Sequence, residues 1–195
     1  MGHAVPIAPV IVGIGGSTSS ASTTTLLLRR SLELAAARGA RTVIFTGAEL
    51  ATLPIFSTAE ADSGPPQAAA LVSAVRSADA VIIASPGYHG GMSGLVKNAI
   101  DHLELLRDDR RPYLDGRAVG AIVAAAGWQS CGSTLAAVRS TIHALRGWPT
   151  PFGVSVNSAE QHAAADGTFD PSVTRSLEIL VGQLLDFASW RASAH

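Results

Sequence analysis

Short apolar segments alternate with segments of helical periodicity five times along the 195-residue chain, and no other feature constrains the fold as strongly. Each apolar segment has the length and the branched side chains of a buried strand, and each following segment repeats apolar residues at the spacing of one helix face. This alternation predicts a parallel sheet, because right-handed crossovers carry a helix across the sheet after every strand. Strands are expected at residues 10–14, 41–46, 79–85, 119–125 and 150–156.

Helices are expected after these strands, at residues 26–37, 67–77, 93–106, 135–145 and 171–190. Five β–α repeats in a chain of this length favour a doubly wound five-stranded parallel sheet with helices on both faces, in the flavodoxin-like order. Neither a repeat nor a low-complexity linker divides the sequence, so residues 1–195 are expected to form one α/β domain. The long segment 47–66, punctuated by Pro and Gly, is typical of a functional or interfacial loop.

The composition excludes several classes of partner. The net charge is -1 and like charges do not cluster, which argues against nucleic acid or an anionic membrane surface as the main partner. No apolar run is long enough to span a bilayer and no signal peptide is evident, while the one cysteine, Cys131, indicates a reducing compartment. A cytoplasmic protein is therefore expected. A metal site is not, because metal-ligand spacing is missing among the histidines at positions 3, 89, 102, 143, 162 and 195.

The loop after the first strand carries an unusual run of hydroxyl groups. Gly15 and Gly16 are followed by nine residues, Ser17 to Thr25, of which eight bear hydroxyls, directly before a helix. Helix N-termini bind phosphate through unpaired N–H groups, and the hydroxyls add neutral donors; helix capping is the alternative explanation. The run lacks the Lys of a P-loop and the third Gly of a dinucleotide fingerprint, so a monophosphate such as that of FMN is favoured. The predicted phosphate-binding residues are Ser17, Ser19, Ser22, Thr23 and Thr24.

The loop after the third strand is rich in Pro and Gly and contains two ring side chains. Such a loop exposes backbone N–H groups that can meet the edge of a flat heteroaromatic ring, while an aromatic side chain lies against its face. The residues predicted to hold a ring are Pro86, Gly87, Tyr88, His89 and Gly90.

Residues 86–101, P-G-Y-H-G-G-M-S-G-L-V-K-N-A-I-D, resemble the P-x-Y-x-x-x-x-[SP]-G-x-L-K-N-A-I-D signature of the NAD(P)H-dependent FMN reductase family. Gly16-Ser17 with Ser22, and the segment 53–56 (L-P-I-F), match two further motifs of that family, and the resemblance spans roughly residues 10–130. It implies a flavodoxin-like fold, FMN as cofactor, NADPH or NADH as hydride donor, and a homodimer or homotetramer. It also implies that Gly127 and Trp128 lie beside the flavin; alternatively, Trp128 covers the edge of the core.

Two positions depart from the family pattern. Ser19 stands where the family has a phosphate-binding Arg, and Gly87 stands where many members have Glu. Loss of the Arg is expected to weaken FMN binding by about 1.5–3 kcal/mol, as for a charged hydrogen bond. Weak binding favours an enzyme that releases reduced FMN to a partner monooxygenase over one that keeps it bound to reduce quinones, azo compounds or a pathway intermediate. A flavodoxin-type electron carrier or a non-catalytic binding module are alternatives from other classes.

No catalytic side chain is predicted, because the cofactor would carry the hydride chemistry. Lys97 is the only lysine in the sequence, which suggests either a specific contact or an ion pair with Asp101 on the helix surface. Arg107, Arg110 and Arg111 follow the third predicted helix and suggest either contact with a nicotinamide nucleotide phosphate or a solvated turn.

Overall fold

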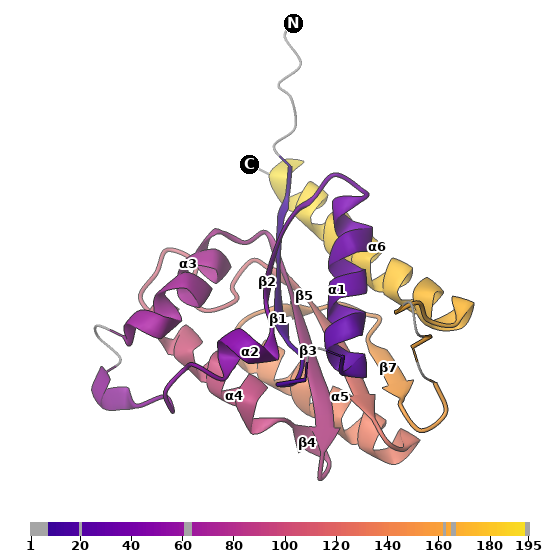
Figure 1. Cartoon of the computed structure of the whole chain (residues 1–195). Coiled ribbons are helices and arrows are strands. Elements are labelled where there is room, and N and C mark those ends of the chain that lie inside the picture. Colours follow the sequence, from indigo (N-terminus) through magenta and orange to yellow (C-terminus); the bar gives the residue numbers. More distant parts are fainter. Residues whose placement is uncertain (1–7, 20, 61–63, 162, 165–166, 194–195) are drawn as a thin grey trace, which may run out of the picture.

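The computed structural model describes residues 8–19, 21–60, 64–161, 163–164 and 167–193. A twisted sheet lies between two layers of helices, and the path β2-β1-β3-β5-β6 crosses it in parallel (Figure 1). These strands are β1 (Val10–Gly15), β2 (Arg41–Phe45), β3 (Ala80–Tyr88), β5 (Ala118–Ala125) and β6 (Trp148–Pro149). Two strands lie off this path: β4 (Gly91–Met92) pairs antiparallel with β3, and β7 (Val154–Asn157) pairs with β5.

The prediction of five strands is wrong in number, because the sheet has seven strands. The strand expected at residues 150–156 forms only from Val154 onward, as β7, and a separate short strand, β6, lies just before the expected segment; both pair with β5. Pro149 and Pro151 lack the N–H group that a continuous ladder needs, and their positions coincide with the break. The seventh strand, β4, forms because β3 continues past its predicted end at Ser85 to Tyr88. The chain then reverses direction, and β4 pairs antiparallel with the end of β3.

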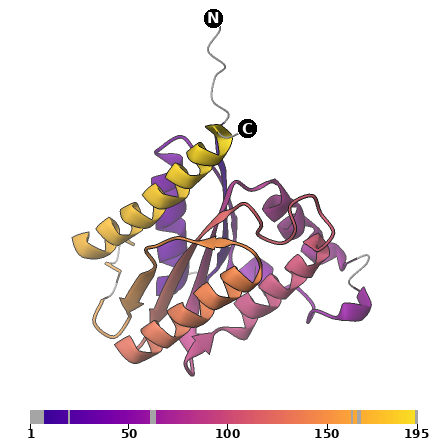
Figure 2. The same cartoon turned by 180° about the vertical axis from the view of Figure 1, so that it is seen from behind.

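Helices on both faces of the sheet are confirmed (Figures 1 and 2). One face is covered by α1 (Thr23–Ala36) and α6 (Pro171–Ser193), and the other by α3 (Ala69–Ser77), α4 (Gly94–Asp101) and α5 (Trp128–Ala144). The short α2 (Gly47–Leu50) and the 3₁₀ helices at Thr58–Glu60, Pro66–Ala68 and His102–Leu106 lie in the connections.

The two helix layers bury separate apolar cores. Ile82 packs with Leu28 and Leu177 on the α1/α6 face, whereas its neighbour Ile83 packs with Leu103 on the α3/α4/α5 face. Successive side chains of a strand point to opposite faces, so a strand covered on both sides must be apolar at every position, as β3 is over Ala80–Ala84.

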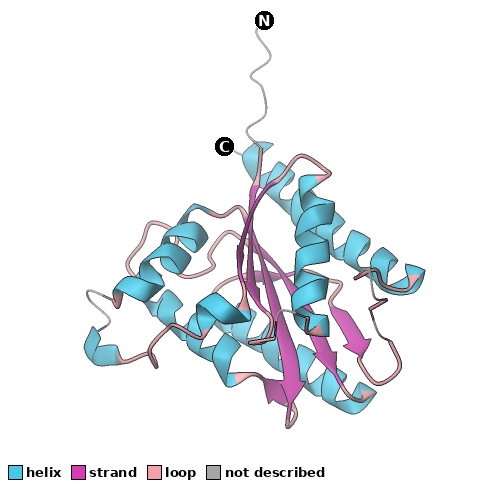
Figure 3. Cartoon of the chain, in the orientation of Figure 1, coloured by secondary structure: helices cyan, strands magenta, loops and turns pink. Residues whose placement is uncertain are grey.

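Figure 3 shows the arrows of β3, β5 and β7 running towards the lower edge of the molecule, and β1 runs parallel to β3. The carboxyl ends of these parallel strands therefore share one edge, and the loops singled out from the sequence lie there. The opposite edge holds the starts of β3 and β5, preceded by Asp79 and Arg117.

Candidate functional site

The loop after β1 is held in a tight curve by the hydroxyl of Thr25. Thr25 Oγ1 accepts the N–H of Ser17 at 3.3 Å, lies 2.8 Å from Ser22 Oγ and donates to the carbonyl oxygen of Ser19 at 3.4 Å. Gly16 has a φ of +97°, and a Cβ there would lie 2.5 Å from Thr25 Oγ1, so the turn requires glycine. Thr25, which sequence reasoning left out of the predicted site, therefore organises the loop from a fully buried position.

The start of α1 adds backbone N–H donors to the same loop. Ser22 is the N-cap: its Oγ accepts the N–H of Thr25 at 3.2 Å and its carbonyl accepts the N–H of Leu26. The N–H groups of Thr23 and Thr24 precede the first intrahelical bonds, and α-helix geometry directs them away from the helix start. Capping therefore explains Ser22 and leaves two backbone donors at the positive end of a 14-residue helix.

The loop after β3 is a β-hairpin. Gly87 pairs with Met92 and Tyr88 with Gly91, and the turn between them places His89 at a φ of +51° and Gly90 at +84°. Two successive positive φ angles are typical of a two-residue hairpin turn. The ring-holding segment predicted as a loop is therefore a rigid β-ribbon, with the side chains of Tyr88 and His89 exposed at its tip.

A hydrogen bond between β3 and the start of α4 fixes the base of this hairpin. Ser85 is fully buried, and its Oγ accepts the N–H of Ser93 at 2.9 Å while donating to the carbonyl of Pro86. Ser93 is in turn the N-cap of α4, with its Oγ accepting the N–H of Val96 at 3.3 Å.

The loop after β1, the hairpin and the start of α4 together enclose a hollow of about 210 Å³, which we call the carboxyl-end pocket. Of the predicted site residues, Ser17, Pro86 and Tyr88 line it. The other predicted residues lie outside its lining: Ser19, Ser22, Thr23, Thr24, Gly87, His89, Gly90, Gly127 and Trp128. Sequence reasoning missed the three residues that α4 contributes, although Ser93-Gly94 is a recognisable helix start. The lining residues are Gly16, Ser17, Thr18, Pro86, Tyr88, Ser93, Gly94 and Leu95.

Gly87 occupies a position without room for a side chain. A Cβ there would lie 2.8 Å from Thr134 Oγ1, 2.9 Å from Ala125 Cβ and 3.1 Å from Ser130 Oγ. The first turns of α5 therefore fill the space that the Glu of many family members would need. The same contacts bring the loop after β5 against the hairpin.

The loop after β5 is held by Asn157, the last residue of β7. Gly127 donates its N–H to Asn157 Oδ1 at 2.8 Å, and Asn157 Nδ2 donates to Glu160 Oε1 at 2.7 Å. The indole N–H of Trp128 donates to the other carboxylate oxygen of Glu160 at 3.1 Å. The Trp128 side chain is 52% exposed, so covering the core is not its role.

The connection after β2 is attached to α4. Asn98 accepts the N–H of Phe56 at 2.8 Å and donates to the carbonyl of Pro54 at 2.9 Å, and His102 Nε2 lies 3.0 Å from that same carbonyl. Lys97 on the same helix forms the i,i+4 ion pair with Asp101, with an Nζ–Oδ1 distance of 2.6 Å, which confirms the simpler interpretation of that lysine.

Other candidate chemistry finds no support. Cys131 is buried, its Sγ lies 3.3 Å from the carbonyl of Val156, and burial raises the pKa of its thiol, so it is not an activated nucleophile. Within the described ranges, no group of three or more His, Cys, Asp or Glu side chains could hold a metal ion. His3, His162 and His195 lie outside the described residues. None of the described helices is long and apolar enough to cross a membrane.

The carboxyl-end pocket passes a simple test for a phosphorylated ring ligand. Ser17 and Thr18, which bear hydroxyl groups, line it, the exposed ring of Tyr88 stands beside them, and the chain leads from Ser17 into the N-terminus of α1. No charged side chain lines the pocket, so an anion would be held there by neutral donors and the helix dipole.

Comparison with known proteins agrees with this geometry. A model of the family described as "NADPH-dependent FMN reductase" matches residues 9–161. The FMN-dependent NADPH-azoreductase of Staphylococcus haemolyticus is 27% identical over 118 residues, and the match covers 59% of each chain. The chain therefore aligns with less than two thirds of that relative's length.

Solved structures show the same fold at low identity. The flavoenzyme NAD(P)H:(acceptor) oxidoreductase of Paracoccus denitrificans has a TM-score of 0.68 and 22% identity, covering 93% of this chain and 98% of its own. A flavodoxin, WrbA-like protein of Agrobacterium tumefaciens has a TM-score of 0.60 and 14% identity, covering 94% and 99%. The fold is thus flavodoxin-like. Because the family match spans more than half of its residues, the chain belongs to the NADPH-dependent FMN reductase family.

Proposed function

We propose that the protein is an NAD(P)H-dependent FMN reductase that transfers hydride from NADPH or NADH to FMN. The observation that carries this proposal is the carboxyl-end pocket, in which a phosphate-type loop and a β-hairpin with an exposed aromatic tip adjoin one another. Family membership supports the choice of FMN as the ligand. The likeness to an FMN-dependent NADPH-azoreductase and to an NAD(P)H oxidoreductase supports the choice of hydride donor.

The start of α1 would hold the FMN phosphate. The side chains of Ser17 and Ser19 and the N–H groups of Thr23 and Thr24 would donate to it, and the helix dipole would stabilise its charge. Ser22 would take part by holding the helix start as its N-cap. The ordering of this loop by Thr25 would keep those donors in place before the ligand arrives. Preorganised donors reduce the entropy lost on binding.

The hairpin and the loop after β5 would hold the ring. Backbone N–H groups over the segment from Gly87 to Gly90 would meet its polar edge, Pro86 and the side chains of Tyr88 and His89 would flank it, and Gly127 with Trp128 would lie on the far side. When bound, FMN would supply the redox chemistry by accepting a hydride from the nicotinamide. The protein's part is positioning and electrostatic stabilisation, which requires no side-chain acid or base.

The fate of the reduced FMN distinguishes two versions of this function. Release to a partner monooxygenase is favoured by Ser19, since a phosphate held without a guanidinium dissociates more readily. Retention and reduction of an azo compound or a quinone is the second version, supported by the azoreductase relative. The small net charge of -1 weighs against a flavodoxin-type electron carrier, which is usually strongly acidic. We place the enzyme in the cytoplasm, as one domain per chain and as a homodimer or homotetramer.

The test is an FMN titration of the purified protein, followed by NADPH and NADH oxidation with and without added FMN, an azo dye or a quinone. Turnover proportional to free FMN would support the reductase that releases its product. Tight binding with turnover only on a dye or quinone would support the second version. Absence of FMN binding at concentrations up to millimolar would refute both.

A further inference from the structure

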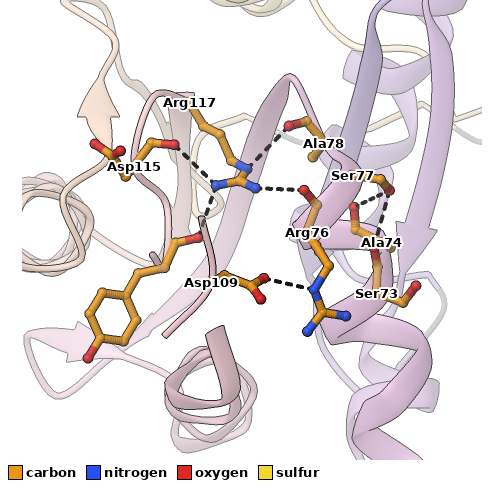
Figure 4. Close-up of polar contacts among 9 residues, drawn as sticks. Ser73, Ala74, Arg76, Ser77, Ala78, Asp109, Asp115 and Arg117 are labelled. Atoms are coloured by element: carbon orange, nitrogen blue, oxygen red, sulfur yellow. Dashed lines mark hydrogen bonds and ion pairs between the residues drawn. The ribbon is translucent and has the colours of Figure 1, made fainter. Parts of the chain in front are cut away.

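A second polar cluster lies at the amino-terminal ends of the strands and centres on Arg117. This side chain is fully buried at the start of β5, yet its guanidinium contacts no carboxylate within hydrogen-bonding distance among the described residues. Figure 4 shows it between the end of α3 and the segment that leads into β5. It donates to four backbone carbonyls, those of Arg76 at 2.8 Å and of Ala78, Tyr113 and Asp115 at 3.2 Å each.

Three further arginines gather around this group. Arg111 is half-buried and donates from Nε and Nη2 to the carbonyls of Asp115 and Gly116 at 3.3 Å. Arg76 is bonded through Nε to Asp109 at 2.7 Å, which leaves its two Nη groups for other acceptors. Arg110 is exposed, and no ion pair to it occurs within the described ranges.

These residues enclose a cavity of about 240 Å³, which we call the arginine cavity. Four arginines and one aspartate are among its lining residues, so the lining carries an excess of positive charge. Drug-sized ligands usually occupy pockets of about 300–1,000 Å³, and this cavity is therefore sized for a small group. Its lining residues are Arg76, Ser77, Asp109, Arg110, Arg111 and Arg117.

The excess of positive charge is unfavourable in this partly buried place. Burial together with the neighbouring Arg111 lowers the pKa of Arg117 to about 10, and burial together with Arg191 lowers the pKa of Arg111. Asp109, Asp115 and Asp79 oppose the shift at Arg117 without cancelling it. A bound anion would relieve the repulsion between these guanidinium groups, because opposite charges a few ångströms apart attract.

The arginine cavity is separate from the carboxyl-end pocket. Arg117 precedes β5 and Ser77 precedes β3, whereas Pro86 lies near the end of β3, so most of the length of the sheet separates them. At about 3.3 Å per residue, the nine residues of β3 span roughly 30 Å. Arg110 and Arg111 therefore do not face the pocket in which a nicotinamide would meet FMN.

We propose that the arginine cavity is a second anion site that binds a phosphate group, either as free inorganic phosphate or as the terminal group of a larger molecule that extends into solvent. Guanidinium groups match the geometry of phosphate oxygens and can donate two hydrogen bonds at once. Arg110, Arg111 and Arg76 supply the free donors, and Arg117 supplies buried charge behind them. Asp109 is the one carboxylate among the lining residues, and four arginines would repel a cation, so a cation is an unsuitable occupant.

The test is isothermal titration of inorganic phosphate into protein saturated with FMN, so that the loop after β1 is occupied, in a chloride buffer of matched ionic strength. Saturable binding is expected for the wild type. Arg110→Gln and Arg111→Gln should each weaken it about tenfold or more, as loss of a charged hydrogen bond does. Arg175→Gln is the matched control: it removes an exposed charge from α6 sixteen residues before Arg191, roughly 24 Å along the helix, and should leave the affinity unchanged.

A titration with adenosine 5′-monophosphate distinguishes the two sources of the phosphate group. Tighter binding than that of inorganic phosphate, lost in the same two variants, would identify a nucleotide-like ligand, and weaker binding would identify free phosphate. Binding that does not saturate, or that is equal in the wild type, Arg110→Gln and Arg111→Gln, would overturn the proposal. If phosphate raised the stability of the protein without saturable binding, the cause would be a general salt effect, and this result would count against the proposal.

Discussion

At the residue scale, the packing around Gly87 explains why this chain tolerates no larger side chain there. The atoms nearest to an added Cβ are Thr134 Oγ1 and Ala125 Cβ, both under 3 Å away and both on rigid elements. We expect Gly87→Ala to lower the free energy of unfolding by about 1–3 kcal/mol, the usual effect of overpacking. Gly91→Ala is the matched control, since nothing lies within 4 Å of its Cβ position. Urea unfolding of both variants measures the difference. Equal losses of unfolding free energy would show that the neighbouring atoms move aside from the new Cβ without a measurable loss of stability.

Ser19 is the second residue whose replacement is informative. It is exposed, and its N–H bonds to Ser17 Oγ at 3.2 Å within the proposed phosphate loop. Ser19→Arg restores the guanidinium of the family pattern, and we expect it to tighten FMN binding about tenfold, the lower end for a charged hydrogen bond because the site is open to solvent. Quenching of flavin fluorescence measures the affinity.

The control for this gain is Ala36→Arg, which adds the same charge at the exposed far end of α1. If it tightened FMN binding as much as Ser19→Arg does, the gain would reflect net charge alone, and the phosphate would not lie at the start of the helix.

At the scale of elements, Arg117 ties the end of α3 to the start of β5. Its guanidinium donates to the carbonyls of Arg76 and Ala78 at the end of α3, and its positive charge interacts favourably with the negative end of the helix dipole. We expect Arg117→Met to destabilise the protein by about 3 kcal/mol, because four carbonyls lose their donor. Arg117→Lys should recover only part of this loss, since an ammonium cannot span the four acceptors. Urea unfolding, with Arg175→Met as a surface control, checks both; wild-type stability in Arg117→Met would mean that water replaces the guanidinium.

The capping box of α2 makes a prediction about pH. Burial alone would raise the pKa of Glu49, but hydrogen bonds from the hydroxyl and N–H of Thr46 outweigh it and lower the pKa below 4.5. A carboxyl whose pKa is lower in the folded state stabilises the protein above its unfolded pKa, and this contribution is lost as pH falls through the folded value. The difference in unfolding free energy between the wild type and Glu49→Gln should therefore be constant near neutral pH and shrink below about 4.5.

Measurement of that difference from pH 7 to pH 3 decides the point. Glu178→Gln, an exposed replacement on α6, provides the baseline. A difference that does not change with pH would indicate that the capping box contributes through its uncharged hydrogen bonds.

Much of this element structure follows from the sequence. The strand 79–85 and the helix containing Leu135 and Val138 were predictable because apolar periodicity reports burial directly. The hairpin at His89-Gly90 was not, since Gly-rich segments look alike whether they form a loop or a ribbon, and only pairing of Gly87 with Met92 makes β4. The contact between Asn157 and Gly127 joins positions thirty residues apart, which no local pattern reveals.

At the scale of the molecule, loops distant in sequence meet because parallel strands end at one edge. A ligand bound in the carboxyl-end pocket would contact the loop after β1, β3 and α4 at once, and it should stabilise the whole fold. We expect FMN at a hundred times its dissociation constant to add about 2.7 kcal/mol to the free energy of unfolding. Thermal denaturation with and without FMN measures this, with riboflavin, which lacks the phosphate, as the control. Equal stabilisation by riboflavin would exclude phosphate binding at α1.

The two outer borders of the sheet differ in what they offer another chain. At one border, β2 presents an uninterrupted five-residue backbone with Arg41, Thr42 and Val43 exposed. At the other, the two-residue β6 and the four-residue β7 both pair with β5, and Pro149 and Pro151, which have no N–H group, interrupt this border. Pairing between copies through β2 would join two sheets and leave a proline-interrupted border at each end. Growth by strand addition would then have only short, interrupted strands to continue from, which disfavours open-ended fibres.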